Sequence, residues 1–299
     1  ARKTPYRIQN RNKEYFQEKM GTFHDEEFKN EPDTDWSLAG NRRWAEEIRR
    51  KWRKGPDDRP VGIPLVIAGD EIYDNREKRA CKDPSLIDEN VYVSDCAMAN
   101  ENDVKKAMST AVADPDGWRD TTHKDRHEVL SRVAMELRLA RADLIGSAAA
   151  NTGKVFTEAD TEVSEAIDFA EFYPYSMKIF SDLKNIECRG KGVGLVISPW
   201  NFPIAIPCGG IVASLAAGNT VIFKPASAAV LVAWELCRCF WRAGVSRKTL
   251  QFLPCEGSTL GPKLISHPSV NYIILTGGTE TGMMISRERP DMYLAAETG

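Results

Sequence analysis

Hydrophobic residues first recur at a regular interval between Asn41 and Lys54, where Trp44, Ile48 and Trp52 follow one another at four-residue spacing. Apolar side chains at that spacing line one side of an α-helix, so the pattern predicts an amphipathic helix with one buried face. The residues around it are rich in charge. We therefore expect residues 1–60 to form a helical arm or linker that packs on the body of the protein.

Shorter patterns typical of β-structure follow this arm. The apolar run Leu65–Ala68 and the segment Glu71–Tyr73 flank the turn-forming pair Gly69-Asp70, and this arrangement predicts a β-hairpin. Two further segments, Lys78–Cys81 and Val91–Ala97, have the composition of strands. The region between the arm and residue 100 is therefore expected to be mostly β-sheet.

The helical period returns between residues 100 and 180. Thr122 and Asp125 resemble a capping box, in which each side chain accepts the backbone N–H of the other residue. Another helix is expected at Glu158–Lys178. After the capping box, one continuous apolar face predicts a single helix. The residues of this face are Leu130, Val133, Leu137, Ala140, Leu144 and Ala148.

In the last third of the chain, short apolar runs alternate with helix-like stretches. Such alternation is typical of a parallel sheet with helices on both faces, and ligands of these sheets bind beyond the carboxyl ends of the strands. The strands are expected at Val193–Ile197, Thr220–Phe223, Leu250–Leu253, Tyr272–Leu275 and Tyr293–Ala296, and the helices at Ile204–Ala217, Ala228–Ala243, Thr259–Ser266 and from Thr279.

Composition narrows the class of protein. Apolar residues make up 42% and charged residues 28%, and the net charge of -3 gives no reason to expect nucleic acid or an anionic membrane as a partner. No apolar run is long enough to span a bilayer, and Ala1–Asn30 contains no signal-peptide core. The seven cysteines are scattered without a zinc-binding pattern. Cys208 and Cys237 are expected to be buried thiols, and a reducing cytoplasm is the expected location.

The loop after the first strand of the alternating region reads Ser198-Pro199-Trp200-Asn201-Phe202-Pro203. Pro203 suits the first turn of a helix, where its missing N–H has no cost. Asn201 has two interpretations. It caps the helix, or its amide points into the crevice and donates to a developing oxyanion. Residue types alone leave both open.

Later strand ends carry groups suited to sugar and phosphate. Lys224 is either a solvated cation or a ligand of hydroxyls and phosphate. Thr276–Gly282 places glycines and hydroxyl residues at the start of a helix, where free N–H groups and the helix dipole favour an anion. The nearest match to the GxGxxG fingerprint, Gly190–Gly194, precedes a strand and so lacks the required context. Glu297, after the last strand, is either a general base or a helix-capping acid.

Four segments in this order, VGLVISPWNFP, LAAGNTVIFKPAS, ILTGGTETG and AAETG, resemble the aldehyde dehydrogenase superfamily, and the likeness runs from about residue 25 to the end. Asn30–Trp36 and Glu162–Phe169 are similar to the 1-pyrroline-5-carboxylate dehydrogenase branch, especially the dehydrogenase half of bifunctional proline-utilisation enzymes. The resemblance implies a Rossmann-like open parallel sheet with helices on both faces. It also implies one NAD(P)-binding domain over residues 61–299, with the family's catalytic domain outside this chain.

In that family a cysteine thiolate attacks the aldehyde, hydride passes to the nicotinamide, and water hydrolyses the resulting thioester. The resemblance makes Asn201 the oxyanion donor and Glu297 the base for water. Lys224 would hold the adenosine ribose, and Thr298 would border the nicotinamide. The other cofactor contacts that it implies are Ile197, Ser198, Pro199, Trp200, Ala226, Ser227, Gly257, Gly261, Thr276, Gly277, Gly278, Thr281 and Gly282, and it implies no metal.

Some positions depart from the family's usual pattern. Ser227 stands where many NAD-preferring members carry a glutamate, and without that carboxylate a 2′-phosphate is not repelled, so NAD is expected while NADP stays compatible. Cys255 stands near the adenine where many members have glycine, and Gly278 replaces a common serine. No cysteine occupies the context of the family's nucleophile. We therefore expect this 299-residue chain to lack aldehyde oxidation activity of its own.

The narrower branch implies a substrate, L-glutamate γ-semialdehyde in equilibrium with 1-pyrroline-5-carboxylate, which is oxidised to glutamate in proline catabolism. Glu165 is then either a contact for the substrate ammonium group or a solvated surface acid. Two other functions are open: a dehydrogenase for another aldehyde, such as succinate semialdehyde, and a non-catalytic nucleotide-binding module. Members of the family assemble through a strand arm, expected here at Leu183–Arg189, so the parent enzyme is expected to be a homo-oligomer.

Overall fold

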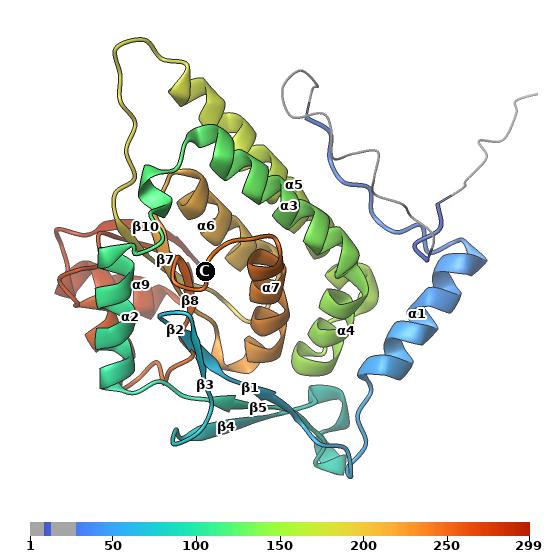
Figure 1. Cartoon of the computed structure of the whole chain (residues 1–299). Helices are drawn as coiled ribbons and strands as arrows, with labels where there is room; N and C mark the ends of the chain where they lie inside the picture. The colour runs from blue at the N-terminus through green and yellow to red at the C-terminus, as the bar shows by residue number, and fades with distance from the viewer. Residues whose placement is uncertain (1–8, 13–27) are drawn as a thin grey trace, which may run out of the picture.

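The computed structural model describes residues 9–12 and 28–299, which form two β-sheets covered by helices (Figure 1). The larger sheet has seven strands in the order β10-β9-β6-β7-β8-β2-β3, and the smaller has three in the order β1-β5-β4. The mixed α/β architecture with a largely parallel sheet is the predicted one.

The parallel part of the larger sheet follows the alternation of strands and helices in the sequence. Each of its strands except the last, β10, is followed by a helix that returns the chain to the starting edge, so all the carboxyl ends lie along one edge. These strands are β6 Val193–Ile197, β7 Thr220–Lys224, β8 Leu250–Phe252, β9 Tyr272–Gly277 and β10 Tyr293–Thr298.

The opposite edge of the sheet is the predicted hairpin, formed by β2 Leu65–Ile67 and β3 Asp70–Ile72. β2 also pairs antiparallel with β8, so the sheet is mixed. The turn differs by one residue from the predicted pair, because Ala68 and Gly69 have the positive φ angles of 55° and 94°. Two residues with positive φ give a hairpin loop whose twist matches that of the strands.

One face of the sheet carries a thick layer of helices. Alternate residues of β7 separate the two faces: Val221 and Phe223 pack among these helices, and Ile222 packs on the other side. The layer consists of α3 His123–Leu139, α4 Arg141–Thr152, α5 Phe156–Ser181, α6 Ala205–Ala216 and α7 Val230–Arg242, the last preceded by the short helix η4 Ser227–Ala229.

The helix predicted after Thr122 is two helices. The capping box is confirmed, since Thr122 Oγ1 accepts from Asp125 N–H at 3.1 Å and the Asp125 carboxylate accepts from Thr122 N–H at 3.2 Å. The helix then ends at Leu139, because the φ of -88° and ψ of 3° at Ala140 leave helical geometry. The predicted apolar residues on both sides of this break are buried. The pattern therefore identified the buried face but could not show a break of one residue within it.

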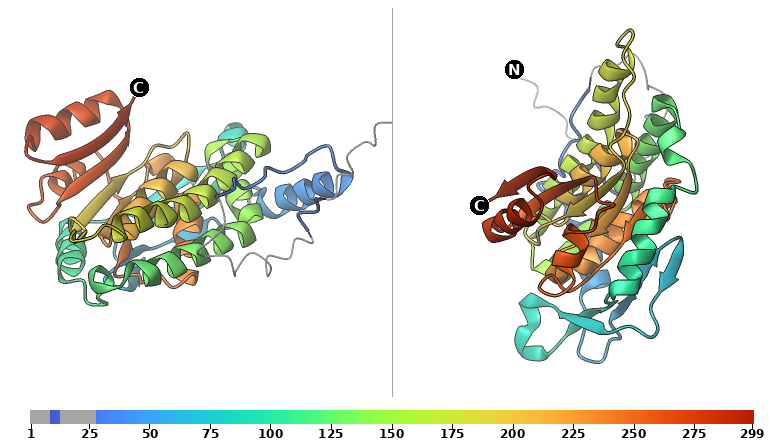
Figure 2. Two further views of the ribbon diagram at one scale, coloured as in Figure 1. Left: turned by 90° about the horizontal axis from the view of Figure 1, so that it is seen from above. Right: turned by 90° about the vertical axis from the view of Figure 1, so that its left-hand side faces the viewer.

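The second face of the sheet has a thinner cover. It is formed by α2 Glu101–Ala113, α8 Gly261–Ile265 and α9 Thr279–Glu288, which pack on the strands through a separate hydrophobic cluster. The short helix η3 Trp118–Asp120 links α2 to α3. In Figure 2, α9 and β10 extend to one side of the molecule, away from the thick helical layer.

The smaller sheet lies below the larger one in Figure 1 and contains β1 Val61–Ile63, β4 Lys78–Lys82 and β5 Tyr92–Ala97. The last two are the predicted strands, and η2 Pro84–Glu89 joins them. β1 was not foreseen because it has only three residues and lacks an alternating pattern.

The arm helix α1 Ala39–Trp52 packs on α4 and places Trp44 and Ile48 in the hydrophobic cluster of the thick layer. Ahead of it, the Glu31 carboxylate lies 2.9 Å from the guanidinium of Arg138 and 3.6 Å from that of Arg141. These contacts fasten the described part of the arm to α3 and α4. The division of the chain at residue 60 stays a prediction.

The strand arm expected at Leu183–Arg189 is absent, because this segment forms no strand after the end of α5. A strand needs a neighbour for its backbone hydrogen bonds, and the described residues offer none here. Leu183 and Ile186 are exposed. Among the helices that the structure describes, none combines the length and apolar character needed to cross a membrane.

Candidate active site

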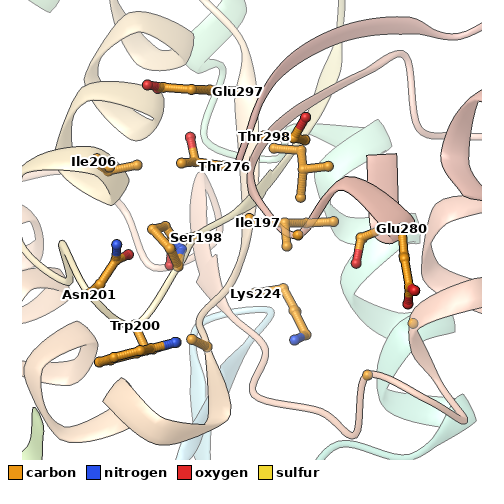
Figure 3. A pocket seen from close by; sticks show the side chains of 18 of the residues that line it. Ile197, Ser198, Trp200, Asn201, Ile206, Lys224, Thr276, Glu280, Glu297 and Thr298 are labelled. Carbon is orange, nitrogen blue, oxygen red and sulfur yellow. The ribbon is translucent and has the colours of Figure 1, made fainter. Parts of the chain in front are cut away.

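A cleft of about 940 Å³ opens where the parallel strands of the larger sheet end (Figure 3). It brings together groups from segments that are far apart in the sequence. The predicted residues that line it are Ile197, Ser198, Pro199, Trp200, Asn201, Lys224, Ala226, Ser227, Gly257, Gly261, Thr276, Gly277, Gly278, Thr281, Glu297 and Thr298.

Asn201 lies in the loop between β6 and α6 and does not cap the helix. α6 begins at Ala205, its N-cap residue is Ile204, and no side chain of the N-cap residue bonds to the helix. Pro203 likewise lies in the turn before the helix rather than in its first turn. The capping interpretation is therefore wrong, and the Asn201 carboxamide is free to face the cleft, as Figure 3 shows.

Two charged side chains from outside the loop contact its backbone. Glu162 of α5 accepts the N–H groups of Ile204 at 2.9 Å and Ala205 at 3.2 Å. Lys154 forms an ion pair with Glu162 and donates to the backbone carbonyl of Asn201 at 2.7 Å. Neither role was expected. Glu162 belongs to a segment noted for its resemblance, but no pattern linked it to a loop some forty residues later.

Lys224 and Ser227 form one end of the cleft. Lys224 is the last residue of β7, is half-buried, and forms no ion pair within residues 9–12 and 28–299. Its ammonium lies 3.8 Å from the point where a Cβ on Gly257 would stand, so Gly257 and Lys224 are neighbours in the lining. A cation and a hydroxyl at this end can both bind sugar oxygens or a phosphate.

The turn between β9 and α9 supplies backbone donors. Gly278 is the N-cap of α9 and has no side chain to cap it, so the first N–H groups of the helix have no capping side chain. A Cβ added to Gly278 would meet nothing within 4 Å, which leaves room for a group in the cleft. Glu280 lies in the first turn, also lines the cleft, and is the one acid in this part of the helix.

Glu297 is in β10 and pairs in register with Thr276, while Thr298 pairs with Gly277. The strand continues through Thr298, so Glu297 is not a helix-capping acid. It is exposed at the edge of the sheet. In Figure 3 Glu297 and Asn201 lie on different sides of the cleft, with Ile206 and Thr276 between them in this view.

Two predicted residues do not line this cleft. Gly282 is buried behind it, and a Cβ there would come within 3.2 Å of Thr298 Cγ2. Glu165 lies at an exposed position of α5. Its pKa is raised, mainly by partial desolvation and to a smaller extent by the negative charges of Glu162 and Asp168. Lining residues that were not predicted are Phe202, Ile206, Leu264, Ile265, Leu275, Glu280, Met284 and Gly299. Most are apolar, and nothing in their spacing separates them from core residues.

None of the seven cysteines lines the cleft. Six are buried, as expected for Cys208 and Cys237, and burial raises the pKa of both these thiols well above its ordinary value. Cys255 is buried beside the cleft rather than in it, and burial raises its pKa to about 11. Such thiols are poor nucleophiles, because the thiolate is the reactive form.

The chemistry of the lining suits an extended ligand with an anionic centre. The glycine turn at the start of α9 offers backbone N–H groups, Lys224 and Ser227 offer a cation and a hydroxyl at one end, and Trp200 offers an exposed ring. These are the groups that a dinucleotide requires for its pyrophosphate, ribose and ring systems. The residues present therefore fit a dinucleotide cofactor.

Comparison with known proteins identifies the family of the chain. A family model described as "Aldehyde dehydrogenase family" matches residues 73–298. The 1-pyrroline-5-carboxylate dehydrogenases of Geobacillus sp. (strain WCH70) and Anoxybacillus flavithermus (strain DSM 21510 / WK1) are 34% and 35% identical over 270 residues, which are 86% of this chain and 51% of theirs. The chain thus spans about half the length of the curated relatives it matches.

Solved structures agree. The 1-pyrroline-5-carboxylate dehydrogenase from Thermus with bound NAD has a TM-score of 0.84 at 31% identity, over 92% of this chain and 56% of that one. Proline utilization A from Bdellovibrio bacteriovorus also has a TM-score of 0.84, at 27% identity over 91% of this chain and 30% of that one. Because the family model covers most of the chain and relatives match in both sequence and fold, the chain belongs to the aldehyde dehydrogenase family.

Proposed function

We propose that this chain supplies the cofactor-binding part of an enzyme that oxidises an aldehyde to a carboxylate with NAD or NADP. We further propose that the aldehyde is L-glutamate γ-semialdehyde, in equilibrium with 1-pyrroline-5-carboxylate, so that the reaction belongs to proline catabolism. The observation that carries the proposal is that Asn201, Lys224, Gly278 and Glu297 line one cleft at the strand ends. The names of the similar proteins support the choice of substrate.

The residues of this chain would hold the adenosine and pyrophosphate parts of the cofactor, which when bound accepts the hydride from the aldehyde carbon. Lys224 and Ser227 bind the adenosine ribose. The N–H groups at the start of α9 bind the pyrophosphate, where the helix dipole favours negative charge. Ser227 offers no carboxylate that would repel a 2′-phosphate, so the cleft accommodates NADP as well as NAD.

Asn201 and Glu297 act on the aldehyde and on water. The Asn201 amide donates a hydrogen bond to the aldehyde oxygen as that atom gains negative charge, which lowers the barrier to attack. Glu297 accepts a proton from the water that releases the carboxylate product. Both residues line the same cleft and lie on different sides of it, as this division of roles requires.

The nucleophile comes from outside these 299 residues in this proposal. The buried cysteines cannot reach the cleft, and Cys188, which is exposed, follows α5 and does not line it. The chain by itself is therefore expected to leave aldehydes unchanged, while the complete enzyme oxidises them.

Activity assays test the substrate and the need for a further segment. NADH formation is measured for the complete gene product and for the 299-residue chain, each with L-glutamate γ-semialdehyde and with succinate semialdehyde. The complete product should prefer the former by kcat/KM, and the chain alone should be inactive. Turnover by the chain would refute the missing nucleophile, and preference for the second aldehyde would change the assigned substrate.

Calorimetric titration with NAD and NADP tests the cleft in this chain alone. Binding should be weak, because a second wall over the nicotinamide is not part of these residues in this proposal. Lys224→Ala should weaken it about tenfold or more, since a hydrogen bond to a charged group contributes roughly 1.5–3 kcal/mol. Lys105→Ala, which removes an exposed cation on α2, is the matched control. Equal affinity of both variants would move the ribose site elsewhere.

A further inference from the structure

The start of α6 is satisfied by a side chain from another helix. Glu162 accepts the N–H groups of both Ile204 and Ala205 through one oxygen, Oε2, and is only 2% exposed. The N-cap residue Ile204 has no polar side chain of its own to offer. A carboxylate at this position also interacts favourably with the positive end of the helix dipole. Glu162 thus caps α6 from α5.

Lys154 links the Glu162 carboxylate to the backbone carbonyl of Asn201. Its ammonium pairs with Glu162 Oε1, donates to the backbone carbonyl of Asn201 at 2.7 Å, and lies 4.1 Å from the centroid of the Phe202 ring. The pair therefore binds the backbone at Asn201 itself and again at Ile204, three residues later.

The loop has few means of fixing itself. Pro199, Pro203 and Pro207 have no N–H, so the segment offers fewer backbone donors than an ordinary loop and helix start. The Lys154–Glu162 pair is buried, with side chains 9% and 2% exposed. Separating the two charges inside the protein would leave each of them buried without its partner, which is unfavourable. The two side chains are therefore expected to stay together in one geometry.

We propose that Glu162, held by Lys154, is a positioning residue for Asn201: it fixes the loop so that the carboxamide points at the reacting carbonyl oxygen. This inference rests on the oxyanion role of Asn201 in the proposed function. Neither charged group has to touch the substrate. Their effect comes from the direction of the Asn201 amide, because a displacement of about 1 Å at a reacting group costs about 10²-fold in rate.

Kinetics of the complete enzyme provide the first test. Glu162→Ala should lower kcat about 10- to 100-fold with KM for NAD within about twofold, and Glu162→Gln should recover part of the loss because its amide oxygen still accepts the two N–H bonds. Glu128→Gln, which removes an exposed carboxylate on α3, should match the wild type. A lower melting temperature with unchanged kcat would show a merely structural role and overturn the proposal.

Lys154→Met extends this test if Glu162→Ala does not fold, since it removes the donor to Asn201 and keeps the cap on α6. It should lower kcat as well. Asn201→Ala separates the oxyanion role of Asn201 from the positioning role of Glu162. If it leaves kcat unchanged, the proposed oxyanion role fails. If it lowers kcat but the Glu162 and Lys154 variants do not, only the positioning role fails.

Hydrogen exchange in the 299-residue chain tests the contact without any activity. Peptides that cover residues 201–206 should exchange faster in Glu162→Ala than in the wild type, because the N–H groups of Ile204 and Ala205 lose their acceptor. Peptides from β7 should not change. Unchanged exchange at residues 201–206 would overturn the proposal.

Discussion

The two walls of the cleft are built very differently. On the interior side, β6 and β7 are almost completely buried and all but two of the twelve residues of α6 are buried. On the edge side, α9 buries only Gly282 and Ile285, and β10 has no buried residue. The edge elements extend away from the helical layer in Figure 2. Asn201 belongs to the interior side and Glu297 to the edge.

This difference fits the demands of the two proposed roles. An oxyanion donor contributes most when it is held in place before the reaction, since no energy is then spent on orienting it. Asn201 has buried neighbours and a buried ion pair to hold its loop. Glu297 lies where few apolar contacts oppose local opening, so the edge is expected to be the less stable wall.

The largest expected effect is a difference in the free energy of unfolding that is lost when each wall is mutated. Phe223→Ala in β7 should lower the free energy of unfolding by about 3–5 kcal/mol, because it leaves a cavity in a fully buried site. Leu294→Ala, at the one half-buried position of β10, should cost about 1 kcal/mol. Urea unfolding followed by circular dichroism measures both. Equal losses would mean that β10 is as firmly packed as the interior.

The next effect concerns Asn201. Asn201→Ala in the complete enzyme should lower kcat by about 10²–10³-fold, the usual cost of one oxyanion donor. Asn102→Ala, an exposed asparagine on α2, is the control. Steady-state kinetics with L-glutamate γ-semialdehyde measure the loss. A change in KM without a change in kcat would assign Asn201 to substrate binding instead.

The hypothesis that Glu165 contacts the substrate ammonium group, although its side chain does not line the cleft, predicts a smaller effect that depends on pH. The raised pKa of Glu165 means that it protonates at a higher pH than an ordinary glutamate, so the carboxylate that binds an ammonium group is lost as pH falls through that value. KM for glutamate semialdehyde should therefore rise toward acidic pH. Glu165→Gln should raise KM about fivefold, since a partly exposed ion pair contributes about 1 kcal/mol, and should flatten the pH dependence.

Succinate semialdehyde, which has no ammonium group, is the control substrate for this variant. Its KM should respond to neither the substitution nor the protonation of Glu165. An equal rise in KM for both aldehydes would make Glu165 a surface acid that shapes α5, the alternative that the sequence left open.

The smallest effect concerns the reactivity of the cysteine thiols, which reports on the packing of the interior and not on function. Cys188 is the exposed thiol and should react quickly with Ellman's reagent, while Cys239 and the other buried thiols should react only on unfolding. Burial raises the pKa of Cys239 to about 12. Cys188→Ser should abolish the fast phase. Several fast thiols would show that the interior wall opens easily.

The strand ends were the most predictable part of the molecule. Continuous apolar runs such as Val193–Ile197 and Thr220–Phe223 identify buried parallel strands, and topology then places Asn201, Lys224 and Glu297 along one edge. Local pattern was sufficient here, because the side-chain period and the alternation of elements point to the same arrangement.

Features that depend on distant partners were not predictable. Asn201 resembles an N-cap in sequence, but the cap comes from Glu162 on another helix. The break at Ala140 leaves the apolar period intact and so has no signal in the sequence. The strand predicted at Leu183–Arg189 needs a pairing neighbour that the described residues do not supply. At Asn201 a contact from another helix decides the outcome, and at Leu183–Arg189 the lack of a pairing strand among the described residues does so.

Trp200 gives the cleft an optical property. It is 59% exposed in the cleft, whereas Trp44, Trp118 and Trp234 are at most 9% exposed in the core. The other three tryptophans, Trp36, Trp52 and Trp241, are half-buried. An indole in water emits at longer wavelengths than a buried one, so the red edge of the emission spectrum is expected to come largely from Trp200. A ligand that stacks on this ring should quench that edge selectively. The protein therefore carries its own fluorescent reporter of cleft occupancy, and Trp200→Phe should remove the signal while leaving the cleft's shape nearly intact.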